Sequence, residues 1–233
     1  MASEPEILLY TSHTCPWAHR AHIALAELGF QYNEQIIDLS VPRTPEYLKI
    51  NPRGVVPSLS YDGEIITESA IVSQFLADRH PSHLLPPSNS KEGALKRARI
   101  NFFVDAYFGK VNSYVFKAFG AKSVEESEAI SVEFVNAVVK ELEPLLSDAA
   151  PFFGGSDKLS FAEVLTGSFV IRLSSLIKYG VLPSSISHGL QDKAPNFYRW
   201  LQAVIEHPSV TYIYNEEAII EGFKNMIARR RVA

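Results

Sequence analysis

Residues 10–20 read YTSHTCPWAHR and contain the only cysteine of this 233-residue chain. The apolar run ILLY over residues 7–10 predicts a short buried strand. Pro16 follows Cys15, and proline is favoured in the first turn of a helix, where its missing N–H would have no partner anyway. Apolar residues then recur at helical spacing up to Gly29, a typical helix-ending residue. We therefore predict a strand, a short loop and a helix that begins beside Cys15.

The following segment extends this unit to a small α/β domain. A second strand is predicted over residues 32–38 and a short helix over residues 45–50. Asp62-Gly63 separates two β-prone runs and is a strong hairpin signal. Ser69 then caps another helix. The predicted order is β-α-β-α-β-β-α, a mixed sheet covered by helices, whose first two strands are parallel because a right-handed crossover joins them.

The rest of the chain is predicted to be helical. Residues 83–90 are rich in proline and serine and form a linker. Beyond them apolar residues step by three and four, as at Val135, Val138 and Leu142. Ser160 and Glu163 have the spacing of a capping box, which starts a helix. We expect an α/β domain over residues 1–82, the linker, and an all-helical bundle domain over residues 91–233.

Composition narrows the range of partners and compartments. The net charge of -4 gives no reason to expect nucleic acid as a partner. No apolar run is long enough to cross a membrane, so we expect no membrane association. The single cysteine excludes an internal disulfide framework and is compatible with the cytoplasm, where we expect the protein. We expect no metal.

Cys15 is the candidate nucleophile. The free backbone N–H groups and the dipole at a helix N-terminus favour a negative charge, and so favour the thiolate. The alternative is an inert, buried cysteine, since free cysteines are usually buried. The position between a strand and Pro16 favours the reactive thiol. His19 lies one turn further on; it would favour the thiolate if protonated, but we expect a partly exposed helix residue.

The chain supports only single-thiol chemistry at this position. Ala18 stands where a dithiol oxidoreductase would hold its second cysteine. An external thiol must therefore resolve any mixed disulfide at Cys15. Glutathione is the natural candidate, and it needs a binding site beside Cys15.

Two later segments could provide that site. A cis bond at Val56-Pro57 would expose the N–H and C=O of Val56 for strand-like pairing with a peptide, although an ordinary trans proline is the alternative. At the predicted start of the next helix, the N–H and hydroxyl of Ser69 could hold a carboxylate, and Glu68 could pair with an ammonium group. Taken alone, these two residues could equally be a capping serine beside a solvated acid.

Several motifs, in this order and spacing, resemble the cytosolic glutathione transferases, and in particular their cysteine-containing omega-like group. In the first half they are CPWAHR over residues 15–20, NPRGVVP over residues 51–57 and ESAI over residues 68–71. In the second half, SFAE over residues 160–163 and FYRW over residues 197–200 are similar to helical motifs of the family. The resemblance covers the whole chain.

The resemblance implies a thioredoxin-like domain followed by a helical domain, in a protein that is often a homodimer. It implies that glutathione, as co-substrate, binds beside Cys15. The residues implied to hold it are Pro16, Trp17, Val56, Pro57, Glu68 and Ser69. Omega-like members resemble glutaredoxins in activity, which implies thiol transfer, dehydroascorbate reduction and a small electrophilic, disulfide or glutathionylated substrate.

Two positions depart from the omega-like pattern. Thr44 stands where these enzymes often have a lysine near the glycyl end of glutathione, and the adjacent Arg43 is our candidate to replace it. Phe169 stands where the pattern has tryptophan, so an aromatic wall is kept with a smaller ring. Phe169 and Tyr107 are our candidates for the substrate pocket, while most aromatic residues of this region are expected to form core.

Two other functions stay open. In a conjugating transferase or isomerase, Ser12 or Thr14 would donate a hydrogen bond to the glutathione thiolate, and Cys15 would be a bystander. The chain could also be a non-catalytic glutathione-binding module, because a fold does not determine a function.

Overall fold

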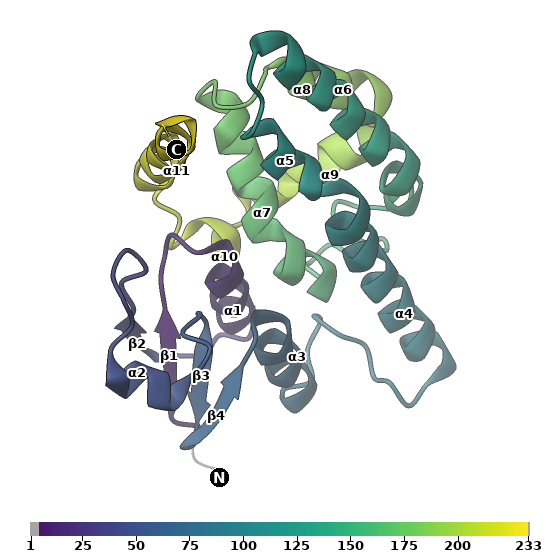
Figure 1. Cartoon of the computed structure of the whole chain (residues 1–233). Coiled ribbons are helices and arrows are strands. Elements are labelled where there is room, and N and C mark those ends of the chain that lie inside the picture. The colour runs from purple at the N-terminus through teal and green to yellow at the C-terminus, as the bar shows by residue number, and fades with distance from the viewer. Residues whose placement is uncertain (1–4, 233) are drawn as a thin grey trace.

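The computed structural model describes residues 5–232, and the side chains of residues 5–228. An α/β domain is followed by a helical domain that lies beside it (Figure 1). The α/β domain contains β1 (Ile7–Thr11), α1 (Pro16–Glu27), β2 (Asn33–Ile36), α2 (Pro45–Ile50), β3 (Ser58–Tyr61), β4 (Glu64–Thr67) and α3 (Ser69–Arg79). This is the predicted element order.

The four strands form one mixed sheet in the order β2-β1-β3-β4. β1 pairs with β2 in parallel, and β3 is antiparallel to both β1 and β4. The predicted parallel pair and the hairpin at Asp62-Gly63 are thus confirmed. β2 is shorter than predicted, because it is an edge strand whose four residues are all exposed. On the face away from the main core, the Tyr47 ring of α2 lies 5.7 Å from that of Tyr10.

The second half consists of helices. They are α4 (Lys91–Ala106), a π-helical turn η1 (Tyr107–Val111), α5 (Ser113–Ala118), α6 (Val124–Glu141), a 3-10 turn η2 (Glu143–Leu146), α7 (Phe161–Lys178), α8 (Ser185–Lys193), α9 (Pro195–Glu206), α10 (Pro208–Thr211) and α11 (Glu216–Val232). The capping box of Ser160 and Glu163 is present and begins α7. Nearly all of α7 is buried, so it is the central helix of this half.

The proline-rich connection between α3 and α4 is fixed to the helical half. Leu84 and Leu85 are buried within it. The Leu84 carbonyl accepts a hydrogen bond from the Phe161 N–H at 2.9 Å, and the Pro86 carbonyl accepts one from Arg97 Nε at 2.7 Å. α1 packs against α7, and one apolar core runs through both halves. The domain limits at residues 82 and 91 stay a prediction.

Within residues 5–232, no helix combines the length and the apolar character that crossing a membrane would require.

Candidate functional site

Cys15 occupies the N-cap position of α1. Its backbone is extended, its N–H donates to the Ser12 carbonyl at 3.0 Å, and its own carbonyl accepts from the His19 N–H at 3.1 Å. The thiol does not cap the helix and lies 4.0 Å from the carbonyl oxygen of Val56. Cys15 is half-buried. The sulfur therefore sits at a helix start, beside the segment that was predicted to bind a peptide backbone.

The Val56-Pro57 peptide bond is cis, which decides between the two alternatives that the sequence left open. The preceding carbonyl, that of Val55, accepts hydrogen bonds from the Tyr47 hydroxyl at 2.6 Å and from Asn51 Nδ2 at 2.9 Å. The Val56 N–H has no backbone acceptor among residues 5–232. Val56 is thus held by its neighbours, while its own N–H is free for a ligand.

The Glu68-Ser69 pair differs in one detail from the prediction. The N-cap of α3 is Glu68, not Ser69, and Ser69 is the first residue inside the helix. Glu68 has a φ of 71°, a left-handed conformation that is uncommon outside glycine and that often marks functional positions. The Ser69 hydroxyl accepts a hydrogen bond from Arg20 Nη1 at 3.1 Å. The Glu68 carboxylate pairs with Arg53.

Arg43 serves the local loop in this structure. Its Nε donates to the Gly54 carbonyl at 2.9 Å, and its Nη1 donates to the carbonyls of Asp38 and Val41. Thr44 caps α2 by accepting from the Tyr47 N–H at 3.2 Å. A ligand carboxylate at Arg43 would have to use Nη2, which makes one long contact of 3.4 Å to Leu39 O.

The aromatic residues at the site surround a buried cation. The Arg20 guanidinium carbon lies 4.5 Å from the Trp17 ring centre, 4.6 Å from that of Phe108 and 5.3 Å from that of Phe169. Trp17 keeps 43% of its surface exposed, whereas Phe169 and Tyr107 are buried. Tyr107 contacts the others through Phe108, at 5.0 Å between ring centres. The two pocket candidates therefore form the buried wall of this cluster, and their substrate contact stays a prediction.

Arg172 holds the Cys15 loop from the helical half. Its Nη2 donates to the carbonyl oxygens of Thr14 at 3.2 Å and His13 at 3.4 Å, and its Nη1 donates to Ser168 O at 2.7 Å. Only 3% of Arg172 and 4% of Arg20 is exposed. Burial lowers the pKa of Arg172 to about 10 and that of Arg20 to about 9. Both stay protonated at neutral pH, and both charges interact favourably with a thiolate at Cys15.

His19 is not the partly exposed residue that we expected. It is fully buried, and its Nδ1 lies 3.1 Å from Arg172 Nη1. Burial and the Arg172 charge hold the pKa of His19 well below its usual value. The ring is neutral at pH 7, so the positive charge near Cys15 comes from the two arginines.

Ser12 and Thr14 remain beside the thiol. Their hydroxyl oxygens lie 3.1 Å apart and share a hydrogen bond. Ser12 is buried and Thr14 is exposed. One of the two hydroxyls donates in this bond, and the accepting hydroxyl keeps its own proton to donate to a ligand.

Sequence reasoning missed Arg20 and Arg172. Arg172 stands inside the apolar run FVIRL over residues 169–173, and a lone charge in such a run indicates a buried, partnered cation. Arg20 stands next to Ala21 and three residues before Ile23, on the buried part of α1. The sequence thus indicates that both arginines are buried, but it does not indicate which groups they contact.

Comparison with known proteins agrees with this geometry. Residues 14–79 match a family model described as glutathione S-transferase, N-terminal domain. Over 88% of this chain and 79% of the relative, the chain is 29% identical to glutathione S-transferase omega-1 of Rattus norvegicus. It is 28% identical to the probable glutathione S-transferase GSTU1 of Oryza sativa subsp. japonica, over 95% of this chain and 97% of that one.

Solved structures share the whole fold. Glutathione transferase Omega 2C from Trametes versicolor superposes with a TM-score of 0.79 and 27% identity, over 97% of this chain and 100% of that chain. Rice GST1, solved in complex with glutathione, also reaches a TM-score of 0.79, at 24% identity and over 98% and 99% of the two chains. The predicted thioredoxin-like domain followed by a helical domain is therefore confirmed.

Proposed function

The chain belongs to the glutathione transferase superfamily, with omega-class members among its relatives, and from that premise we propose a thiol transferase that uses Cys15 as its nucleophile. Membership itself supports a glutathione transferase activity with glutathione as co-substrate. The specific reaction that we propose is deglutathionylation of a small disulfide or glutathionylated substrate, together with dehydroascorbate-reductase-like chemistry.

One observation carries the proposal. The only cysteine of the chain stands at the start of α1, 4.0 Å from the Val56 carbonyl and within the field of two buried arginines. A helix N-terminus and nearby cations are the two features that most favour a reactive thiolate. A cysteine that only filled space would need neither.

The glutathione site in this proposal follows the backbone of the α/β domain. The N–H and C=O of Val56 pair with the cysteinyl residue of glutathione, next to Pro16 and Pro57. The N–H of Ser69 is one of the free amides at the start of α3 and binds the γ-glutamyl carboxylate. Arg20, hydrogen-bonded to the Ser69 hydroxyl, adds positive charge there. Glu68 binds the ammonium group.

The remaining contacts are made by side chains around this backbone. Trp17 is exposed enough to contact the ligand, and its ring lies 4.7 Å from that of Phe169. Tyr107 and Phe169 form the inner wall of the pocket for a small electrophilic or disulfide substrate. Arg43 reaches the glycyl carboxylate only through Nη2.

The reaction proceeds through a mixed disulfide. The Cys15 thiolate attacks the glutathione sulfur of a glutathionylated substrate, forms the Cys15–glutathione disulfide and releases the substrate thiolate, which takes up a proton. The thiolate of a second glutathione attacks the glutathione sulfur of this disulfide. Oxidised glutathione leaves, and the Cys15 thiolate is restored. The net reaction is a thiol–disulfide exchange: one free glutathione is consumed, the substrate thiol is released, and the glutathione unit from the substrate leaves with it as oxidised glutathione.

A conjugating reaction is the second candidate, and the hydroxyl pair beside Cys15 is the observation that favours it. The hydroxyls of Ser12 and Thr14 lie 3.1 Å apart, and whichever of the two accepts in their mutual hydrogen bond keeps a proton that it could donate to a bound glutathione thiolate. In that case Cys15 is dispensable.

Replacing Cys15 separates the two reactions. We expect Cys15→Ser to lose thiol transfer to a glutathionylated peptide and to gain conjugation of an aromatic halide. Ser12→Ala, the matched change in the same loop, should keep thiol transfer. After incubation with oxidised glutathione, a mass spectrum of the wild-type chain should show one glutathione adduct at Cys15.

Thiol transfer retained by Cys15→Ser would refute the proposal. Conjugation that is present in the wild-type chain, lost in Ser12→Ala and unchanged in Cys15→Ser would establish the second candidate. A wild-type chain that fails to bind immobilised glutathione would indicate a module without this activity.

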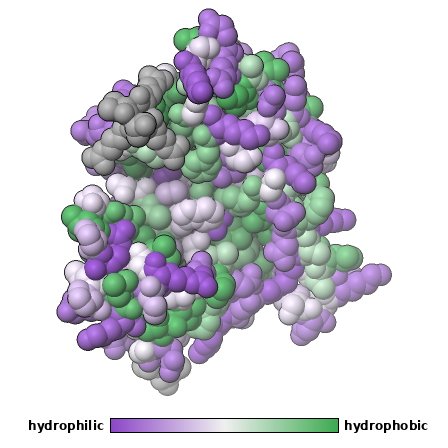
Figure 2. All heavy atoms as spheres, viewed as in Figure 1, coloured by the Kyte–Doolittle hydropathy of each residue, from purple (hydrophilic) through white to green (hydrophobic). Residues whose placement is uncertain are grey.

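We also propose that the protein is a homodimer in the cytoplasm. The support for a homodimer is an apolar surface that a second copy of the chain could cover. This surface lies in the hollow between α3 and α4 (Figure 2), which has a volume of about 700 Å³ and is lined by Ile71, Phe75 and Leu165 among others. Light scattering should give twice the chain mass of 26.0 kDa, and microscopy of a tagged chain checks the compartment. A monomer in light scattering would contradict the homodimer. A tagged chain found at a membrane or outside the cell would contradict the cytoplasmic location.

A further inference from the structure

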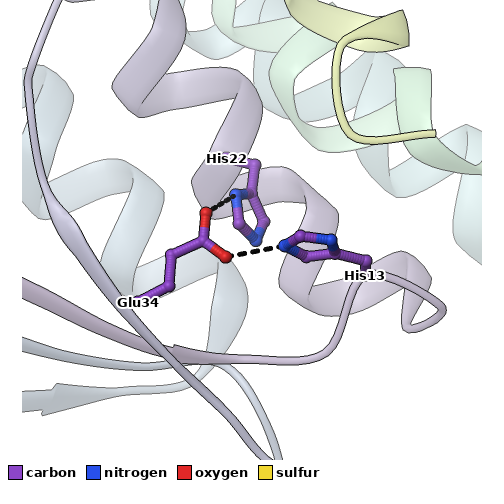
Figure 3. Close-up of side chains that lie close together, drawn as sticks. All are labelled: His13, His22 and Glu34. Carbon is purple, nitrogen blue, oxygen red and sulfur yellow. Dashed lines mark hydrogen bonds and ion pairs between the residues drawn. The ribbon is translucent and has the colours of Figure 1, made fainter.

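Two histidines and a glutamate converge beside the Cys15 loop and take no part in the thiol chemistry. His13 lies in that loop, His22 in α1 and Glu34 in β2, and one ligand atom of each lies within 4.8 Å of the other two. His13 Nε2 is 2.6 Å from Glu34 Oε2, and His22 Nδ1 is 3.7 Å from Glu34 Oε1. Both rings direct a nitrogen toward the Glu34 carboxylate, which lies to one side of them (Figure 3).

We propose that His13, His22 and Glu34 form a binding site for a divalent transition-metal ion such as Zn²⁺. Imidazole nitrogen and carboxylate oxygen are ordinary zinc ligands, at about 2.0 to 2.2 Å, and imidazole also suits copper and nickel. Three protein ligands leave at least one coordination position for water. His13 and Glu34 are exposed, so the ion reaches the site from solvent.

The buried ligand is already oriented by its surroundings. His22 Nε2 lies 2.7 Å from the buried hydroxyl of Thr11. A ligating histidine commonly donates its second N–H to an oxygen in this way, which leaves the lone pair of the other nitrogen for the metal.

The present partner of that lone pair can be released at little cost. The Tyr32 hydroxyl lies 2.7 Å from His22 Nδ1, where it would have to give way to the ion. The same hydroxyl lies 2.8 Å from the Tyr212 hydroxyl, so it keeps a hydrogen-bond partner after the exchange. No polar group is then left buried without a partner by the change.

The separations of the ligand atoms are close to those of a metal site. Two ligands of a tetrahedral zinc ion lie about 3.3 Å apart, as follows from the bond lengths. The observed 2.6 Å to Oε2 and 3.7 Å to Oε1 of Glu34 lie on either side of this value, and the ligand atoms of the two histidines lie within 4.8 Å of each other. His13 is in a loop and Glu34 is in an exposed edge strand, and both can adjust to the ion.

Zinc titration of the Cys15→Ser chain tests the site without interference from the thiol or from transferase activity. The chain should carry no histidine tag. We expect one zinc ion per chain, and at least about 10-fold weaker binding in His13→Ala and in Glu34→Gln, both of which alter exposed residues. His188→Ala is the matched control, because His188 is an exposed histidine of α8 outside the cluster, and it should keep the affinity.

Cobalt provides a second, spectroscopic measurement. Co²⁺ bound to the Cys15→Ser chain should show the visible absorption of a four- or five-coordinate ion, and the two ligand variants should lose it while circular dichroism shows that they are folded. Failure of the Cys15→Ser chain to bind zinc at micromolar concentration would overturn the proposal. Unchanged zinc affinity in both His13→Ala and Glu34→Gln would also overturn it, and His13 and Glu34 would then be an ordinary hydrogen-bonded pair.

Discussion

Cys15 depends on groups that are far from it in the sequence. Arg172 lies 158 positions from Thr14 in the sequence. Its guanidinium nevertheless donates to the carbonyl oxygens of His13 and Thr14 in the Cys15 loop. Burying a guanidinium costs least when its donors have acceptors, and the loop carbonyls accept from Nη2 while Ser168 O accepts from Nη1; Nε has no partner among the described residues. The same contacts fix the loop and bring a positive charge to the thiol. Arg172 is therefore a positioning residue in the proposed reaction.

We predict that Arg172→Met slows the reaction of Cys15 about 10- to 100-fold, because charged hydrogen bonds of about 1.5 to 3 kcal/mol are lost. The rate of alkylation by iodoacetamide at pH 7 should fall by this factor. Glutathione affinity should change little. Arg199→Met, at an exposed arginine of α9, is the control and should match wild type. An alkylation rate equal to that of wild type would contradict the role of Arg172.

His19 makes stability depend on pH. Its pKa is well below the usual value in the folded protein, through burial and through the charges of Arg172, His22 and His13. Below about pH 6.5 the unfolded chain binds a proton at this residue and the folded chain does not. The free energy of unfolding therefore falls on acidification, by up to about 1.4 kcal/mol per pH unit for this group, and is unaffected by it above that pH.

The variant His19→Asn should remove this contribution, because the amide oxygen replaces Nδ1 as the neighbour of Arg172 and does not titrate. Between pH 7 and pH 5, we expect its urea-unfolding free energy to fall by up to about 2 kcal/mol less than that of wild type. His188→Asn, at an exposed position, should behave as wild type. Equal pH slopes in all three chains would contradict the prediction.

At the scale of single elements, α7 depends on one buried carboxylate. Glu163 Oε2 accepts from the N–H and hydroxyl of Ser160 at 2.8 and 2.7 Å. Glu163 Oε1 accepts from the Phe153 N–H at 2.8 Å and from Trp200 Nε1 at 2.7 Å. The capping box thus extends to a loop and to α9.

We predict that Glu163→Ala lowers the free energy of unfolding by about 3 to 5 kcal/mol, because several buried donors lose their acceptor together. Glu143→Ala is the matched variant. Glu143 is half-buried and accepts only the Asn196 and Phe197 N–H groups at the start of α9, so its loss should cost about 1 kcal/mol, as for an ordinary cap. Urea unfolding measures the free energy of unfolding of both variants. Equal losses of stability would contradict the larger role of the Glu163 hydrogen-bond network.

At the scale of the whole molecule, the two halves share one core. Arg20 of α1 donates to the Leu165 carbonyl of α7 at 2.8 Å, and α1 packs along α7. The connection between α3 and α4 is held to the helical half through buried Leu84 and Leu85. A core that crosses the boundary couples the stability of both parts.

We predict a single cooperative unfolding transition, and the two tryptophans of the chain report on it separately. Trp17 lies in α1 and Trp200 in α9. In the single-tryptophan variants Trp200→Phe and Trp17→Phe, the fluorescence transition in urea should coincide with that of circular dichroism in the same variant. Fluorescence of Trp17 that changes well before the circular dichroism signal would show that the α/β half unfolds independently.

The sequence alone determined the features that arise from neighbouring residues. The start of α1 at Pro16, the hairpin at Asp62-Gly63 and the capping box at Ser160 each depend on a few adjacent side chains and backbone groups. For the same reason the positions of Cys15, Val56 and Glu68 at element ends could be predicted. The error at Ser69 was one position, and the error in β2 arose because an edge strand lacks a second partner.

Only the tertiary structure decided which charges meet. The burial of His19, the contact of Arg172 with the Cys15 loop and the approach of His13 to Glu34 depend on how α1, α7 and β2 pack. Local periodicity shows that a side chain faces inward, but it does not show which distant group it faces. The nucleophile could therefore be predicted from its own segment, whereas the groups that orient and charge its loop required the folded chain.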